Sequence, residues 1–309
     1  MSILKGLVAE ELAQPVDPGV RALAAAVAAR HGAAARAVLF YGSCLREARL
    51  DGLMLDFYLI VDDYRRAYGK AWLAAANRLL PPNVFPIGQD GLVAKYAVLS
   101  EADFARLASA RTRNVSVWAR FAQPSRLVWA ADDKARTTVI DAIAGAAPAL
   151  LAAARPMIDA PVQPLDLWRR AFALTYSAEL RAERSGRAPS IVERDAERYL
   201  RFTMPALDAA GISATQGADG FVHFAATANH RSRRAGGRAW RRRRLEGKLL
   251  TLARLAKATA TYAGGIDYLV WKINRHAGTA IALTPWQRRH PILAGVMLLP
   301  KLFLSRAVR

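Results

Sequence analysis

The sequence predicts an α+β fold: a mixed sheet with flanking helices, then a mainly helical second domain, then an apolar and basic C-terminal segment. Strand-like and helical segments alternate up to about residue 130. After Pro124, the spacing of the apolar residues becomes almost entirely helical. The last twenty residues are apolar and have basic flanks. We therefore expect a first domain at 1–130, a helical domain at 131–265 and a C-terminal segment at 266–309.

The first domain is expected to begin with an Ala-rich helix. Asp17-Pro18 indicates where this helix starts, because proline suits the first turn of a helix. Pro81-Pro82 ends a later amphipathic helix, and Gln89-Asp90-Gly91 lies near the turn of a hairpin. The expected elements, in order, are a helix at 18–35, strands Ala37–Tyr41 and Leu53–Val61, a helix at 64–80, a hairpin within 83–100 and a helix at Ala102–Arg111.

The second half of the chain carries few strand signals. In this half we expect a short strand only at Gly220–Ala226. Helical spacing of apolar residues recurs at 133–156, 164–185, 190–210 and 243–263.

Composition and charge restrict the function. The 309-residue chain is 53% hydrophobic, which is typical of a packed protein. Its formal net charge of +20 indicates a polyanionic partner: a nucleic acid, an anionic membrane surface or a phosphate-rich substrate. The single cysteine, Cys44, excludes a disulfide framework and a cysteine-based metal site, and fits a reducing cytosol. Apolar runs are too short for a transmembrane helix, and the N-terminus lacks the features of a signal peptide.

Gly42-Ser43 and Asp56 are the first candidate site residues. Gly42-Ser43 ends one expected strand, and a short helix is expected to follow, so its backbone N–H groups would suit a phosphate. Asp56 lies inside the next strand, where a buried charge is costly without a partner. Facing the same cleft, this carboxylate would hold Mg²⁺ against the phosphate. The alternative is a plain turn and an edge-strand aspartate bonded to a neighbour.

This combination resembles the nucleotidyltransferase superfamily, in which a Gly-Ser turn precedes a strand with two metal-binding carboxylates. Gly42, Ser43 and Asp56 match that pattern, whereas the second carboxylate position is Tyr58. The sequence "YGSC…MLDFYLIVDD" is similar to one branch, the mitochondrial-type phosphatidate cytidylyltransferases. Further segments resemble that family in the same order: "LVAKYAVLS", "LTYSAELRAE", "GKLLTLARLAKATATYAGGIDYLVWKINRHAG" and "LTPWQRRHPILAG". Cys44 and Ala97 stand where the family has glycine.

The resemblance implies that CTP and phosphatidic acid react to give CDP-diacylglycerol and pyrophosphate. It implies that Asp56 holds Mg²⁺ and that Gly42 and Ser43 cradle the triphosphate. Lys95, a cation inside an apolar strand, would neutralise a phosphate; alternatively, it is a surface lysine whose stem packs on a half-exposed hairpin. CTP rather than another triphosphate follows from the family alone.

A second metal ligand is not evident in the sequence. Asp51 lies in the loop before the strand of Asp56 and is a candidate. Asp62 and Asp63 follow the far end of that strand. Six residues of strand span ~20 Å, so we do not expect either of them to reach the site.

Two basic regions suggest attachment to a membrane. The run Arg241–Arg244 is read as a solvated face, as a nucleic-acid contact or as a contact with anionic headgroups. Trp286 is expected by default in the core; alternatively, because it lies beside two arginines, it suits a membrane interface. The apolar segment Pro291–Leu304 either lies in the membrane surface or packs on the helical domain. We therefore expect a cytoplasmic protein that is peripheral on the inner face of the cell membrane.

Two other functions stay open from the sequence. One is a nucleotidyltransferase-like enzyme that acts on RNA or on a soluble small molecule, which the positive charge would suit. The other is a catalytically inactive protein that binds nucleic acid or a membrane. Under the lipid hypothesis, nucleic acid is not an expected partner.

Overall fold

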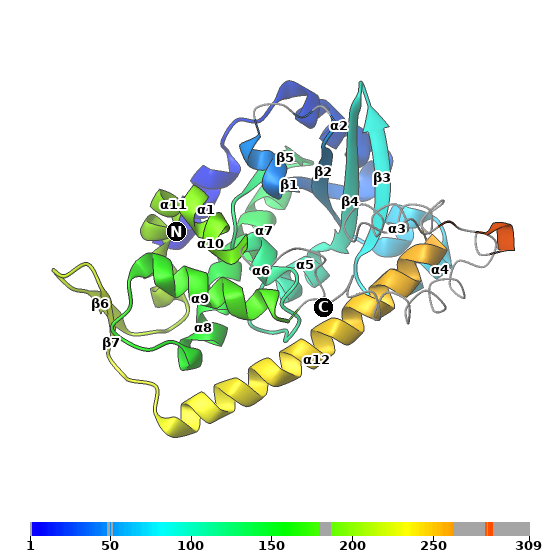
Figure 1. The fold of residues 1–309 in the computed structure, drawn as a ribbon. Coiled ribbons are helices and arrows are strands. Elements are labelled where there is room, and N and C mark those ends of the chain that lie inside the picture. The colour runs from blue at the N-terminus through cyan, green and yellow to red at the C-terminus, as the bar shows by residue number, and fades with distance from the viewer. Residues whose placement is uncertain are drawn as a thin grey trace.

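A five-stranded mixed sheet with helices on both faces forms the centre of the protein (Figure 1). The structure is a computed structural model that describes residues 2–47, 50, 52–178, 187–261, 282 and 284–286. It confirms the predicted α+β class and the mixed sheet with flanking helices. The strand order is β3-β4-β2-β1-β5, with bounds β1 Ala35–Tyr41, β2 Met54–Val61, β3 Asn83–Gln89, β4 Leu92–Ser100 and β5 Ser125–Ala130.

One parallel pair makes the sheet mixed. β2 and β4 run parallel, while β1 is antiparallel to both β2 and β5, and β3 is antiparallel to β4. β3 and β4 form the predicted hairpin. Asp90 and Gly91 have φ angles of 50° and 80°, the left-handed conformation that a tight two-residue hairpin turn requires.

The strand β5 was not predicted from the sequence. This edge strand has six residues, and its central side chains are only half-buried. A run this short, directly after Pro124, has too little alternation of apolar and polar residues to be distinguished from the start of a helix. The predicted short strand at Gly220–Ala226 is confirmed as β7 (Val222–Phe224), whose partner β6 (Ala214–Gln216) was also missed.

The helices of the first half cover the two faces of the sheet. Three of them are shorter than expected. The helix at 18–35 ends at Ala29, and the helix expected at Ala102–Arg111 ends at Leu107. The helix at 64–80 is interrupted at Gly69, which adopts a φ of 61°. One face packs against α2 (Pro18–Ala29), α3 (Tyr64–Tyr68) and α4 (Ala71–Leu79). The other packs against α1 (Ile3–Leu12), α5 (Glu101–Leu107), α6 (Trp118–Phe121) and α7 (Asp133–Ala144).

The described part of the second half is mainly helical and shares a core with the sheet. One hydrophobic cluster includes Leu39 of β1, Trp168 and Trp240. The domain boundary at residue 130 stays a prediction. The helices are α8 (Ala146–Ala154), the short 3₁₀ helix η3 (Arg155–Met157), α9 (Pro164–Tyr176), α10 (Arg187–Arg194), α11 (Ala196–Ala209) and α12 (His230–Thr261).

Among the described residues, one helical stretch, Asp133–Met157, is long and apolar enough to cross a membrane. The most apolar 18-residue part of this stretch is 61% buried inside the protein, and many residues of the stretch belong to the core that the sheet and the helices share. This burial is what a core helix of a globular domain requires. The apolar segment Pro291–Leu304, which we expect either to lie in a membrane surface or to pack on the helical domain, lies outside the described residues.

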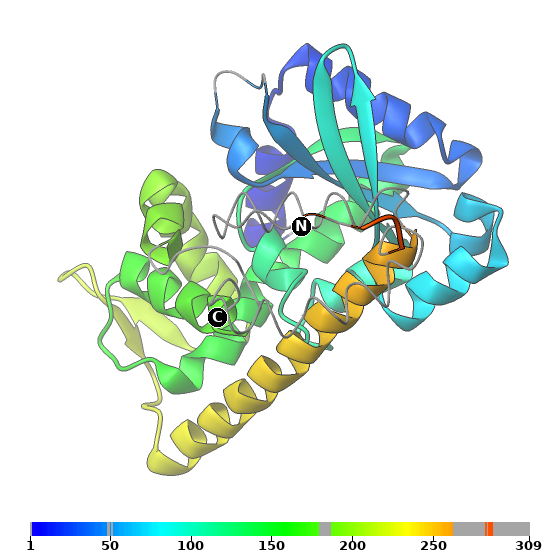
Figure 2. The same ribbon diagram turned by 45° about the vertical axis from the view of Figure 1, so that its right-hand side comes forward.

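α12 runs along one side of the molecule (Figures 1 and 2). It begins well before the predicted helix at 243–263 and includes the Arg241–Arg244 run. Near its end, Arg254 donates to the Pro81 carbonyl at 2.8 Å, and Lys257 donates to the Pro82 carbonyl at 2.8 Å. α12 is therefore attached to the segment that leads into β3.

A buried ion pair joins α1 to α11. The side chains of Glu11 and Arg198 are 8% and 12% exposed, and the Arg198 guanidinium donates to both carboxylate oxygens. Arg198 also donates to the Ala122 carbonyl at 3.1 Å. Three elements that are distant in sequence are thus fixed by one side chain.

We predict that Arg198→Met destabilises the protein by about 3–5 kcal/mol, because it leaves the Glu11 carboxylate buried and unpaired. The matched control is Arg201→Met on the same helix. Arg201 pairs with Glu10 at 2.8 Å, but their side chains are 49% and 59% exposed, so we expect a loss below about 1 kcal/mol. Urea unfolding of both variants measures the difference, and equal losses would contradict the role of the buried pair.

Candidate functional site

A row of paired residues crosses four strands at one end of the sheet. Lys95 on β4 pairs with Asp56 on β2, Asp56 pairs with Tyr41 on β1, and Tyr41 pairs with Ser125 on β5. Directly opposed residues on neighbouring strands share a face of the sheet. Along β2 the same face continues with Tyr58 and Ile60, which belong to the large core. The polar row therefore begins where this core ends.

Asp56 and Lys95 form an ion pair. The Lys95 Nζ lies 3.1 Å from Asp56 Oδ1, and the two side chains are 33% and 24% exposed, respectively. Both predicted catalytic side chains are therefore adjacent and reachable from solvent. The pairing also supplies the partner that a charge inside an apolar strand needs.

Gly42 approaches the Asp56 carboxylate closely. Its φ of 96° and ψ of −167° lie in a region that is nearly restricted to glycine. A Cβ at this position would lie 3.2 Å from Asp56 Oδ2. Glycine is thus required twice, by the backbone conformation and by the proximity of the carboxylate. Ser43 follows with an exposed side chain.

The element after Gly42 differs from the expectation. Ser43–Arg46 is a 3₁₀ helix (η2) of four residues, which is too short to create the helix N-terminal phosphate site that the sequence suggested. What remains at this turn is the exposed Ser43 and the backbone around Gly42. The neighbouring Cys44 is buried, and its thiol donates to the Met54 carbonyl at 3.6 Å. Burial and the Asp56 carboxylate raise the pKa of this thiol.

Tyr58 occupies the second carboxylate position of the superfamily pattern, and its environment is suited to a phenol. The side chain is buried, and its ring lies 5.2 Å from the rings of both Tyr41 and Phe121. Its hydroxyl accepts a hydrogen bond from Arg120 Nη1 at 3.1 Å. The Arg120 guanidinium also lies 5.1 Å from the centre of the Tyr41 ring.

Arg120 is a residue of this region that the sequence analysis missed. It comes from α6, far along the chain, and its guanidinium lies against Tyr41, the strand partner of Asp56. The signal was present: Arg120 is the one charged residue in the apolar run Val115–Ala122. The same signal had identified Asp56 and Lys95. Arg120 thus adds a second cation, beside Tyr41 and Tyr58, to the end of the sheet that contains Lys95.

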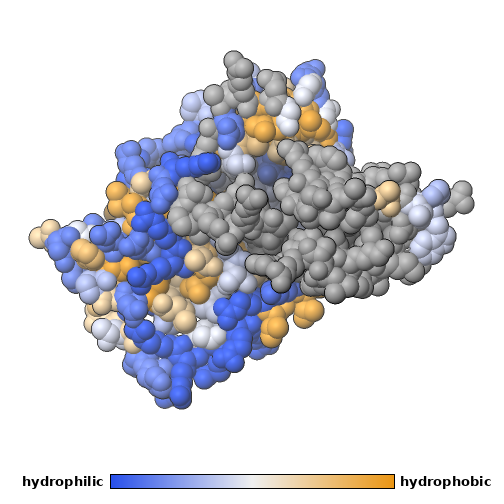
Figure 3. All heavy atoms as spheres, viewed as in Figure 1, coloured by the Kyte–Doolittle hydropathy of each residue, from blue (hydrophilic) through white to orange (hydrophobic). Residues whose placement is uncertain are grey.

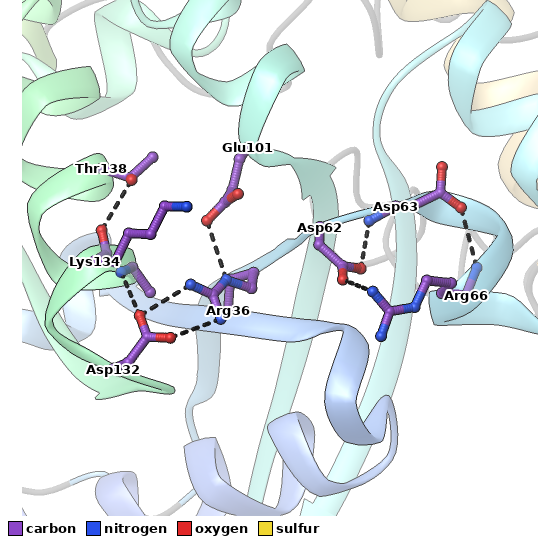
Figure 4. A network of polar contacts seen from close by, with 9 residues as sticks. Arg36, Asp62, Asp63, Arg66, Glu101, Asp132, Lys134 and Thr138 are labelled. Atoms are coloured by element: carbon purple, nitrogen blue, oxygen red, sulfur yellow. Dashed lines mark hydrogen bonds and ion pairs between the residues drawn. The ribbon is translucent and has the colours of Figure 1, made fainter.

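The remaining aspartates of this region have other roles or are not described. Asp51 lies outside the described residues. Asp62 and Asp63 follow the opposite end of β2, as expected, and belong to the network shown in Figure 4. There Asp62 pairs with Arg66, and Asp63 accepts from the backbone N–H of Arg66. Asp63 is the N-cap of α3 and also accepts from the backbone N–H of Arg65.

Mg²⁺ would fit this site only together with a phosphate ligand. The described part of the chain contains no group of three or more His, Cys, Asp or Glu side chains that would hold a metal ion alone. Asp56 offers one carboxylate. Mg²⁺ is commonly held by one or two carboxylates together with substrate phosphates and water, so this donor set suits an ion that binds with a nucleotide.

Comparison with known proteins does not assign the chain to a family. No family model matches the sequence, and no curated protein shows a significant match to it.

We predict that Gly42→Ala destabilises the protein more than Gly32→Ala. Both glycines have positive φ, but nothing lies within 4 Å of a Cβ at Gly32, whereas a Cβ at Gly42 would meet Asp56. The control should lose about 1–2 kcal/mol from backbone strain alone, and Gly42→Ala should lose more. Thermal unfolding measures both losses, and an equal or smaller loss at Gly42 would contradict both reasons for a glycine there, the backbone conformation and the close approach to Asp56.

Proposed function

We propose that this chain is a nucleotidyltransferase-like enzyme that transfers a cytidylyl group from CTP to phosphatidic acid at a membrane surface. The observation that carries the proposal is the solvent-accessible Asp56–Lys95 ion pair beside Gly42. These residues are three of the four that the sequence resemblance selects, and they lie together in the fold. The fourth, Ser43, follows directly.

Each side chain then has a separate part in the reaction. Asp56 would hold Mg²⁺, which when bound neutralises charge on the nucleotide phosphates. The Lys95 ammonium, released from Asp56, would bind a phosphate oxygen. Gly42 leaves room for the triphosphate beside the carboxylate, and the Ser43 hydroxyl would donate to it.

The proposed chemistry needs no strong general base. The acceptor is the phosphate of phosphatidic acid, which is already anionic at neutral pH, and its oxygen would attack the α-phosphorus of CTP. The bond from that phosphorus to the bridging oxygen of the β-phosphate would break, and pyrophosphate would leave. The main requirement is to bring two anionic groups together. Lys95 and Arg120 provide two cations for this purpose.

The direct test supplies the purified full chain with each of the four nucleoside triphosphates, labelled at the α-phosphate, with Mg²⁺ and phosphatidic acid vesicles. We expect label in the extracted lipid with CTP and little with the other three. A parallel reaction also contains RNA. If the label appears in RNA or in a water-soluble product and not in lipid, the proposal that phosphatidic acid is the acceptor is wrong, and the alternative acceptors are favoured.

We predict that Asp56→Asn lowers the transfer rate by about a hundredfold or more, because an amide does not offset the charge of a metal ion. Asp62→Asn is the matched control. Asp62 also pairs with a basic side chain at an end of β2, and its side chain is 25% exposed, against 24% for Asp56. The control should keep its activity. If Asp56→Asn retains more than about a tenth of the wild-type rate, the metal-binding role is wrong.

We predict that Tyr58→Asp does not raise activity. The substitution removes a buried ring from contact with Tyr41 and Phe121 and leaves a carboxylate beside Arg120, where the two would pair. Activity and unfolding temperature should both fall. Tyr58→Phe keeps the ring and removes only the hydroxyl, so it separates the effect of ring packing from the effect of the hydrogen bond with Arg120. A large gain in activity by Tyr58→Asp would instead indicate a site that has lost a second metal ligand.

A further inference from the structure

α12 has one face that packs on the protein. Trp240 is 1% exposed, and its indole Nε1 donates to the Ala153 carbonyl at 2.9 Å. A Cβ at Gly236 would lie 2.8 Å from Pro156, and a Cβ at Gly247 would overlap the Ala178 carbonyl. Arg254, seven residues after Gly247, bonds to the Pro81 carbonyl. This spacing places the four contacts on one side of the helix.

The opposite face of α12 is basic and exposed. At about 100° per residue, seven exposed side chains fall within an arc of about 100°. Two of them are leucines, Leu245 and Leu249, which are 65% and 67% exposed. We call these residues the basic face: Arg231, Arg234, Arg238, Arg241, Leu245, Lys248 and Leu249. In Figure 3 the hydrophilic atoms along the lower edge of the molecule adjoin apolar atoms over the middle of α12.

The charges of the basic face are not matched within the part of the chain that the structure describes. No carboxylate there pairs with its four arginines or with Lys248. Arginines that flank the face do have acidic partners: Arg233 pairs with Asp159, and Arg242 pairs with Glu246. The basic face therefore presents a row of cations to an external anion.

We propose that the basic face docks on an anionic lipid surface. Clustered Lys and Arg side chains are attracted to anionic headgroups, and apolar side chains between them enter the boundary of the acyl chains. The two exposed leucines favour a lipid partner over a nucleic-acid partner. Phosphates of a nucleic acid would bind the arginines but would leave Leu245 and Leu249 in water, whereas a membrane accommodates both. This proposal does not depend on the chemistry proposed for Asp56.

The test measures sedimentation of the full chain with vesicles of phosphatidylcholine, with and without phosphatidylglycerol. No nucleotide or phosphatidic acid is present, so a failure of the proposed enzyme activity does not affect the result. One variant carries Arg234→Gln, Arg238→Gln, Arg241→Gln and Lys248→Gln. A second carries Leu245→Ser and Leu249→Ser. The matched control removes the same charge from other exposed sites through Arg21→Gln, Arg65→Gln, Lys70→Gln and Lys134→Gln.

We expect the wild type to bind only the anionic vesicles. The charge variant should bind them at least about tenfold more weakly, because it loses four cationic contacts with headgroups, and the leucine variant should also bind them more weakly. The control should bind as the wild type does. All substituted side chains are exposed, so unfolding temperatures should not change. Unchanged vesicle binding by the charge variant would overturn the proposal, as would an equal loss in the control, which would indicate a response to net charge alone.

A gel-shift assay with single-stranded RNA tests whether the basic face binds nucleic acid instead of lipid. If the leucine variant loses vesicle binding and RNA affinity stays weak and unchanged, the lipid assignment stands. If the charge variant loses tight RNA binding while both variants bind vesicles as the wild type does, the basic face is a nucleic-acid surface and the proposal is wrong.

Discussion

The parallel pairing of β2 with β4 determines where the charged residues of the sheet meet. A parallel pair requires a crossover connection, and here residues 62–91 form it, with α3 and α4 on one face and β3 at the edge. This register sets Lys95 beside Asp56 at one end and leaves Asp62 beyond the other end. The polar row, the close approach of Gly42 and the contacts of Arg120 all lie at the Asp56 end.

The ion pair itself contributes little to the stability of the fold. Both side chains are partly exposed, and such pairs stabilise proteins by about 0–1 kcal/mol. The buried Glu11–Arg198 pair and the shared core have that structural role instead. Asp56 and Lys95 can therefore exchange partners when an anionic ligand and a cation arrive, at small cost to the fold. α12, tied to the segment before β3, adds an external cationic surface to the same molecule.

The local sequence was enough to predict β1, β2 and the hairpin, because their apolar runs are bounded by clear turn residues. A charge inside an apolar run identified Asp56 and Lys95, and the same rule would have found Arg120. The sequence did not predict that Asp56 and Lys95 are adjacent, because strand pairing across the crossover depends on tertiary packing. It also missed β5, which is short, and the split of the helix at 64–80, which depends on the left-handed conformation of Gly69.

We propose that the Asp56–Lys95 pair is a binding site and not a structural ion pair. Calorimetric titration of Mg²⁺ and CTP into the wild type and into Asp56→Asn/Lys95→Gln distinguishes these two roles, and urea unfolding checks the fold of both proteins. We expect Mg²⁺-dependent binding of CTP by the wild type and loss of that binding in the double variant, whose free energy of unfolding should change by less than about 1 kcal/mol. Equal binding by both proteins, or no binding by the wild type, would contradict it.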